Sequence, residues 1–168
     1  MDPDFLAQAR LGPGARRSMQ NGKTNCFVDT NLLVYAVDPT DPAKQMRGSN
    51  LLRQIVSNYT LVLSPQSLNE CYHVLAVRRR LAKTDEVRRF IWSLSEFCTA
   101  PYDFETTQLA WTIGDRYGFG WWDSMLLASA SLTQCTLFFS EDMHHEQQVG
   151  SMTILNPFKL EPDFLLAR

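Results

Sequence analysis

Short apolar runs alternate along this chain with longer stretches in which apolar residues recur at helical spacing. Four runs of three or four residues are rich in β-branched or aromatic side chains and predict strands at residues 26–28, 60–63, 136–139 and 152–155. Helical stretches separate the first three of these strands. This alternation predicts an α/β domain whose parallel sheet is covered by helices on both faces.

The helical stretches begin and end at residues that commonly bound helices. Pro42 suits a first helical turn, Thr84 is the expected N-cap of a later helix, and Asp103 is the expected cap of a helix that stops at Gly118. The predicted helices cover residues 42–57, 66–81, 84–98, 103–118 and 121–134. In the first of these, the residues expected to face the core are Met46, Leu51, Leu52, Ile55 and Val56.

Length and composition fit one globular domain. The chain has 168 residues, of which 45% are hydrophobic and 20% charged, so one compact core is expected. We expect a flexible N-terminal tail or leader over residues 1–24, a domain over 25–158 and a C-terminal tail over 159–168. Neither a signal peptide nor a membrane span is expected, because no apolar stretch is long and uninterrupted enough.

Charge and cysteine content narrow the function further. The net charge of −2 means that any nucleic-acid contact must come from a local basic patch. The four cysteines form no C-x-x-C pair and lie in or beside apolar segments. We interpret them as reduced core residues of a cytoplasmic protein, not as a disulfide or zinc framework.

Four acidic residues occupy positions where a parallel sheet gathers ligands. Asp29 and Asp142 each follow a predicted strand, and ligands bind beyond the carboxyl ends of such strands. Glu70 and Asp123 lie near the starts of helices, and Asp123 shares a helix face with apolar residues, which puts it on the inward stripe. Each acid also has a local explanation, as a turn or cap residue after a strand or as a charge favoured at a helix start.

Together the four acids predict a metal site. Clustered carboxylates raise each other's pKa, so they imply a cation between them. An oxygen-only ligand set suits Mg²⁺ or Mn²⁺ better than zinc. The corresponding chemistry is metal-assisted hydrolysis.

The motifs around these acids, in their order along the chain, resemble those of the PIN-domain ribonucleases, and most closely the VapC-type toxins of toxin–antitoxin systems. They are FVDTN at 27–31, SLNE at 67–70, WWDSMLLA at 121–128 and FSEDM at 139–143. The resemblance implies a three-layer α/β/α fold with a central, mostly parallel sheet, RNA hydrolysis dependent on a divalent metal, homodimerisation and a protein antitoxin. It also implies that the metal-binding and catalytic acids are Asp29, Glu70, Asp123 and Asp142. Their polar neighbours Thr30, Asn31 and Ser140 are expected to orient a ligand or water.

Glu141 departs from the family pattern by adding a fifth carboxylate beside Asp142. His144 and His145 follow the same motif, and we interpret them as surface residues. Two functions compete with the ribonuclease: a catalytically inactive PIN-fold binding module, and a magnesium-dependent phosphatase. The phosphatase is less favoured, because Asn31 stands where a D-x-D motif needs its second aspartate.

Two further groups of residues have open interpretations. The basic run of Arg78 to Arg80, with Arg88 and Arg89, is either a phosphate track for RNA or a pair of solvated helix faces. Trp121 and Trp122 either stack on bases or pack into the core, and we expect packing for at least one of them.

Overall fold

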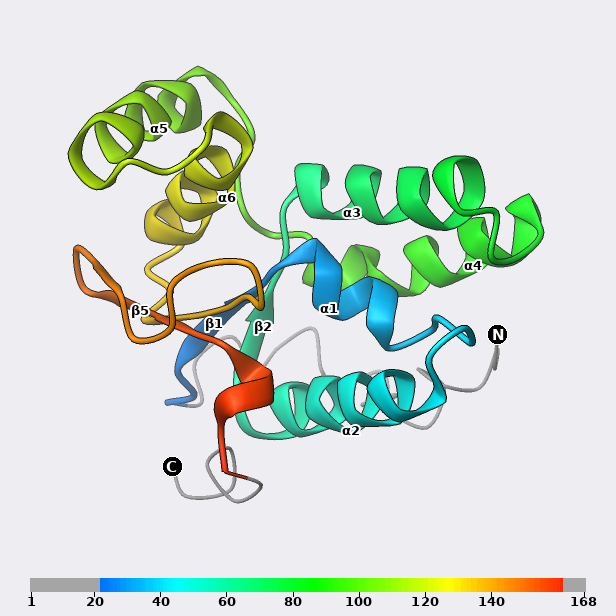
Figure 1. Ribbon diagram of the computed structural model, residues 1–168. Coiled ribbons are helices and arrows are strands. Elements are labelled where there is room, and N and C mark those ends of the chain that lie inside the picture. The colour runs from blue at the N-terminus through cyan, green and yellow to red at the C-terminus, as the bar shows by residue number, and fades with distance from the viewer. Residues whose placement is uncertain (1–21, 162–168) are drawn as a thin grey trace.

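A computed structural model describes residues 22–161 of the chain. Its order is β1 (Asn25–Val28), α1 (Thr30–Tyr35), α2 (Pro42–Asn58), β2 (Thr60–Val62), α3 (Pro65–Tyr72), the π-helix η2 (His73–Arg78), α4 (Thr84–Leu94), the 3₁₀ turn η3 (Ser95–Phe97), α5 (Phe104–Tyr117), α6 (Trp121–Leu132), β3 (Leu137–Phe139), β4 (Gln148–Val149), β5 (Met152–Leu155) and the 3₁₀ turn η4 (Pro157–Lys159) (Figure 1).

The five strands form one sheet in the order β2-β1-β3-β5-β4. The pairs β1–β2, β1–β3 and β3–β5 are parallel, and only β4 runs antiparallel, to β5. The prediction of an α/β fold with a mostly parallel sheet is therefore confirmed. Strand β4 was not predicted, because a pair of residues in a hairpin is too short to show an alternating pattern.

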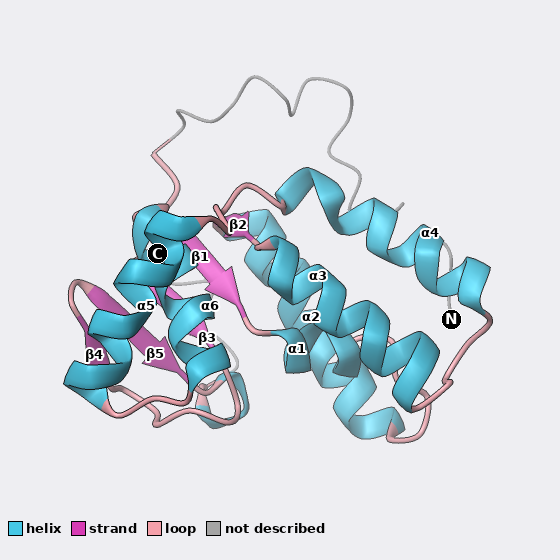
Figure 2. Cartoon of the chain, turned by 90° about the horizontal axis from the view of Figure 1, so that it is seen from above, coloured by secondary structure: helices cyan, strands magenta, loops and turns pink. Residues whose placement is uncertain are grey.

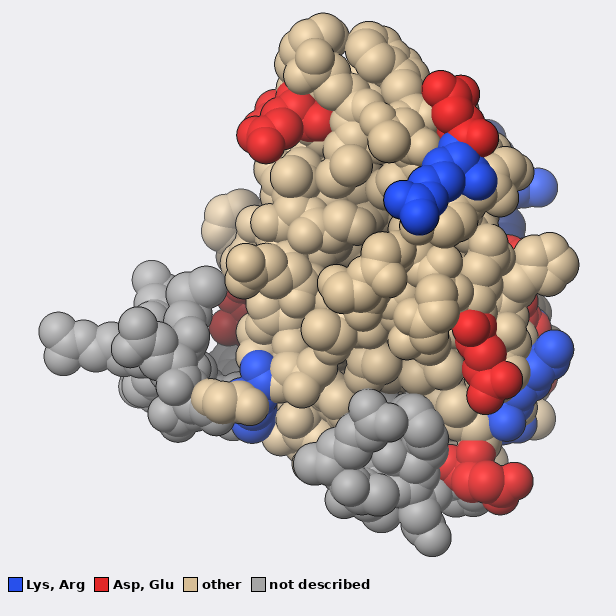
Figure 3. Space-filling view, turned by 90° about the vertical axis from the view of Figure 1, so that its left-hand side faces the viewer, with Lys and Arg blue, Asp and Glu red and all other residues tan. Residues whose placement is uncertain are grey.

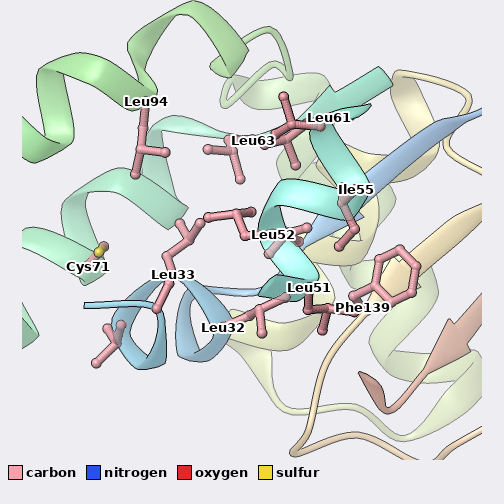
Figure 4. Close-up of a cluster of buried hydrophobic side chains, with 14 of the residues drawn as sticks. Leu32, Leu33, Leu51, Leu52, Ile55, Leu61, Leu63, Cys71, Leu94 and Phe139 are labelled. Carbon is pink, nitrogen blue, oxygen red and sulfur yellow. The ribbon is translucent and has the colours of Figure 1, made fainter. Parts of the chain in front are cut away.

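Two hydrophobic cores lie on opposite faces of the sheet. Cys26, Val28 and Phe139 contribute to one core, together with residues of α1, α2, α3 and α4 (Figure 4). The intervening strand residues Phe27 and Phe138 contribute to the other, against α5 and α6, and their rings stack 5.2 Å apart. This alternation follows from the period of two in a strand. Figure 2 shows α5 and α6 on one side of β1 and α1 to α4 on the other.

Several helix predictions need correction. Met46 is 65% exposed, because it lies about 120° around α2 from the buried Leu52. Thr84 is not the N-cap of α4 but its first residue, since Lys83 is the cap and uses only its backbone carbonyl. The helix predicted to end at Leu81 continues from α3 through η2 and ends at Arg78, the last residue of η2. Helix α4 ends at Leu94, not near Cys98.

Other boundaries are confirmed. The side chain of Asp103 accepts a hydrogen bond from the Thr106 amide at 3.0 Å and caps α5. That helix ends at Gly118, whose φ of +75° is a left-handed conformation that glycine adopts without steric cost.

Both ends of the described chain make contacts. The carbonyl of Thr24 accepts from the Thr60 amide at 3.0 Å, and Leu160 packs against the first core. Residues 1–21 and 162–168 of the two expected tails lie outside the described residues. Within residues 22–161, no helix has both the length and the apolar character needed to cross a bilayer.

Candidate active site

The four predicted acids come from four elements that meet at the carboxyl edge of the sheet. Asp29 directly follows β1 and caps α1, while Asp142 follows β3, the parallel neighbour of β1. Glu70 lies in the second turn of α3, and Asp123 in the first turn of α6. In Figure 1, α1 begins at the end of β1, between α3 and α6.

Asp29 is the buried member of the group, with only 8% of its surface exposed. Its Oδ1 accepts from the Thr30 amide at 2.6 Å, and its Oδ2 accepts from Ser140 Oγ at 2.6 Å. The pKa of Asp29 is raised to about 6, mainly by desolvation, which the two hydrogen bonds only partly offset and to which the charges of Asp123 and Asp142 add. This carboxylate therefore changes its charge close to neutral pH.

Glu70 is half-buried, and both of its carboxylate oxygens accept hydrogen bonds. Thr30 Oγ1 donates to Oε2 at 3.1 Å, and Gln66 Nε2 donates to Oε1 at 2.8 Å. The same Gln66 nitrogen donates to the Trp122 carbonyl at 3.1 Å, which links α3 to the start of α6.

Gln66 is a site residue that the sequence analysis missed. It is 4% exposed, and the orientation of its amide is set by two acceptors on the nitrogen side. The available signal was its position four residues before Glu70 on one helix, which places the two side chains on the same face.

Asn31 connects the acids that follow the two strands. Its Nδ2 donates to Asp29 Oδ2 at 3.3 Å and to Asp142 Oδ2 at 3.1 Å. Its Oδ1 is buried and has no hydrogen-bond partner among the described residues. Asn31 and Ser140 thus hydrogen-bond to the acids themselves, whereas their predicted role in orienting a ligand or water stays a prediction.

Asp123 completes the cluster from an exposed position. Partial desolvation of its carboxyl group raises its pKa, and the charges of Asp142 and Glu70 raise it further. The expectation that Asp123 lies on the buried stripe of its helix is wrong, although Leu126 and Leu127 are buried. The first three residues of α6 are exposed, whereas the helix is buried from Ser124 to Ala130, and Asp123 lies near the charges of Asp142 and Glu70.

Glu141 does not join the cluster. Its carboxylate forms an ion pair with Lys44 Nζ at 2.9 Å. Although partial burial would raise its pKa, hydrogen bonds with Tyr35 and Lys44 lower it overall. The fourth motif thus contributes Asp142 to the cluster and uses Glu141 to attach its loop to α2.

The two histidines lie outside the acidic cluster. His144 is exposed, in agreement with the prediction. His145 is only partly exposed, and its Nδ1 accepts from the Asn156 amide at 3.0 Å. His145 therefore holds the loop after β3 in place.

The basic run divides into residues with different surroundings. Arg79 forms an ion pair with the buried Asp38 and also donates to Thr40. Arg88 pairs with Asp85 on an exposed helix face. Arg78, Arg80 and Arg89 are exposed and make no ion pair within residues 22–161, so the phosphate track remains a prediction for these three. The face over α5 and the β4–β5 edge shows only scattered charged residues (Figure 3).

Both tryptophans before Asp123 are exposed, Trp121 to 42% and Trp122 to 59%. The expectation that at least one of them packs in the core is wrong. They occupy the first turn of α6, beyond the part of the helix that covers the sheet.

The oxygen donors fit a hard divalent cation in their chemistry. Within residues 22–161, no group of three or more Asp, Glu, His or Cys side chains is arranged closely enough to enclose a metal ion. Mg²⁺ does not require such a cage, since it keeps several waters and binds through one or two carboxylates. Desolvation is the main cause of the raised pKa values of Asp29 and Asp123, and repulsion from the neighbouring carboxylates adds to it, so a cation between these groups would favour their charged forms.

Comparisons with known proteins agree with this arrangement. A family model described as "PIN domain" matches residues 26–148, a range that contains all four acids. The search of curated proteins found no match. Among solved structures, a chain from the crystal structure of VapBC2 from Rickettsia felis, bound to a DNA fragment from their promoter, has a similar fold. It shares 13% sequence identity at a TM-score of 0.56, over 78% of this chain and 97% of that one.

Proposed function

This chain belongs to the PIN domain family, and from that membership we propose that it is an endoribonuclease that hydrolyses RNA phosphodiester bonds with a divalent metal. The observation that carries the proposal is the meeting of Asp29, Glu70, Asp123 and Asp142, from four separate parts of the sequence, at one edge of the sheet. Among residues 22–161, no Lys or Arg side chain forms an ion pair with any of these four acids, so they are not explained as salt-bridge partners.

Mg²⁺ or Mn²⁺ is the proposed cofactor, held by Asp29, Glu70, Asp123 and Asp142. When bound, such an ion lowers the pKa of an attacking water and stabilises the leaving oxygen. Asp142 and Asp123 are the exposed members, so they are accessible to hydrated ions and to substrate.

The chain's own residues orient the carboxylates before any ligand binds. Ser140 and the Thr30 amide hold the two oxygens of Asp29, and Asn31 ties Asp29 to Asp142. The Thr30 hydroxyl and Gln66 hold Glu70. Carboxylates fixed in this way need little reorganisation when the reaction develops charge.

We further propose that the protein is the toxin of a toxin–antitoxin pair, that it forms a homodimer and that a protein antitoxin binds it. The VapBC2 assembly of similar fold supports this proposal.

The alternative of a catalytically inactive PIN-fold module differs in its chemistry. An inactive module has no need of all four acids, and here each one faces another acid of the group or is held by a hydrogen bond. The phosphatase alternative has no support from the family match.

The experiment that tests the proposal is cleavage of a pool of structured and unstructured RNAs with Mg²⁺, Mn²⁺ or excess EDTA, followed by mapping of the cut ends. We expect cleavage with either metal, none with EDTA, and a loss of several orders of magnitude in Asp29→Asn. Asp115→Asn, at an exposed position of α5, is the control and is expected to cleave normally. Undiminished cleavage in EDTA would exclude the metal mechanism, and no cleavage under any condition would favour the inactive module.

A further inference from the structure

The first turn of α6 presents a large aromatic surface beside the acidic cluster. Trp122 is 59% exposed, although tryptophan is highly buried on average. It directly precedes Asp123, whose charge interacts with those of Glu70 and Asp142. Neither hydrophobic core includes Trp122, so core packing does not explain why an indole stands at this position.

The backbone of Trp122 is fixed relative to the cluster. Gln66 Nε2 donates both to the Trp122 carbonyl, at 3.1 Å, and to the Glu70 carboxylate, at 2.8 Å. Side chains of a helix lean toward its N-terminus, so the indole of Trp122 lies at the same end of α6 as the neighbouring Asp123. A group bound on the indole would therefore be next to the acids.

Charge alone does not explain how a polyanion would bind here. The protein carries a net charge of −2, and the site itself is acidic. Lys44 already pairs with Glu141, and Arg79 already pairs with Asp38. Stacking of a base on an aromatic ring supplies affinity that does not depend on charge.

We propose that Trp122 is a substrate-binding residue that stacks on an unpaired base of the RNA, next to the phosphate that is cleaved. The inference rests on the proposed ribonuclease function and adds a basis for selecting the substrate. A base inside a continuous duplex has both faces covered by its neighbours, so an indole has no face to stack on. The protein should therefore favour RNA segments with unpaired bases. Trp122 is a better candidate than Trp121, because it is more exposed and its carbonyl is the one held by Gln66.

The test compares binding of a fluorescein-labelled 12-nucleotide single-stranded RNA with that of the same strand in a blunt duplex, by fluorescence anisotropy in EDTA, where the proposed cleavage does not occur. We expect Trp122→Leu to weaken single-strand binding about 5- to 150-fold, which is the range measured for one stacked base, and to leave duplex binding unchanged. Trp122→Phe keeps an aromatic face and should restore most of the affinity. Trp92→Leu is the matched control, since Trp92 is 80% exposed on α4, which lies beyond α3 from α6 (Figure 2).

The outcomes separate this inference from the proposed function. Equal single-strand binding by Trp122→Leu and wild type would overturn it, as would equal losses for both RNAs or no RNA binding by wild type. If Trp122→Leu folds poorly, Trp122→Phe still decides, because a folded Phe variant that binds the single strand no more tightly than the duplex excludes stacking. If wild type binds single strands through Trp122 but does not cleave RNA with metal, the ribonuclease proposal fails and the base-stacking contact stands.

Discussion

Replacing Asp29 with asparagine tests the electrostatics of the acidic cluster in the metal-free protein. Asp29 is buried with a pKa of about 6, above its ordinary value of 3.8. The folded protein therefore binds a proton at Asp29 more tightly than the unfolded chain does. Its contribution to stability is fully present below pH 3.8 and is lost as the pH rises through 6.

The size of this effect follows from the two pKa values. A shift of about 2 units corresponds to about 3 kcal/mol between the fully protonated and fully ionised limits. Between pH 8 and pH 5 only part of it develops, and proton linkage gives about 1.4 kcal/mol of added stability at pH 5. In Asp29→Asn this term is absent at every pH.

The assay is urea unfolding of wild type and Asp29→Asn in EDTA at pH 5 and pH 8. Other carboxylates titrate in both proteins, so the informative quantity is the difference between the two pH dependences. We expect wild type to gain about 1.4 kcal/mol more than the variant on acidification. At pH 8, Mg²⁺ should stabilise wild type more than the variant, because a cation beside Asp29 offsets the buried charge. Asp115→Asn is the control and should follow wild type.

An identical pH dependence in wild type and Asp29→Asn would refute the reasoning, since Asp29 would then titrate at its ordinary pKa. A larger gain in the variant would also refute it, because it would mean that the pKa of Asp29 is lowered by folding. The variant also loses part of the hydrogen bonding around Asp29, but that loss does not depend on pH and cancels in the comparison.

Three further predictions concern other contacts of the site. Without metal, Asp123→Asn should be as stable as wild type or about 1 kcal/mol more stable, and Mg²⁺ should stabilise it much less than wild type. It should also cleave RNA orders of magnitude more slowly. Thermal melts and a cleavage assay measure these effects, and a destabilised but active variant would remove Asp123 from the site. Gln66→Met should lower the free energy of unfolding by about 1–3 kcal/mol and lower kcat, because acceptors including a Glu70 oxygen lose their donor. Urea unfolding measures the first effect and steady-state kinetics the second, and an unchanged kcat would make Gln66 purely structural. Arg79→Met should lower the free energy of unfolding by about 2 kcal/mol in urea, because it leaves the buried Asp38 without its ion-pair partner. This value lies between those of exposed and buried ion pairs, and a variant as stable as wild type would contradict the prediction.

Local patterns in the sequence determined most of the secondary structure. The strand at residues 152–155 and the cap at Asp103 were predicted as they occur, because side-chain spacing and capping chemistry depend on neighbours a few residues away. The motif order also predicted the family, which the family match confirms, and it supplied the four candidate acids. Each of these signals is carried by residues close together in the chain.

Only the tertiary structure decided which side chains meet. Ser140 binds Asp29 across 111 positions, and Gln66 connects α3 to the carbonyl of Trp122 across 56. The choice between Glu141 and Asp142 depended on Lys44, which holds Glu141 away from the cluster.

Exposure was likewise settled by packing and not by pattern. Trp122 and Asp123 precede the buried part of α6 and are exposed, whereas other elements cover the helix from Ser124 to Ala130. Met46 lies in an amphipathic helix but just outside its buried stripe. Helical spacing gives the direction in which a side chain points. Whether that side chain is buried depends on another element that covers it, and that element comes from a distant part of the chain.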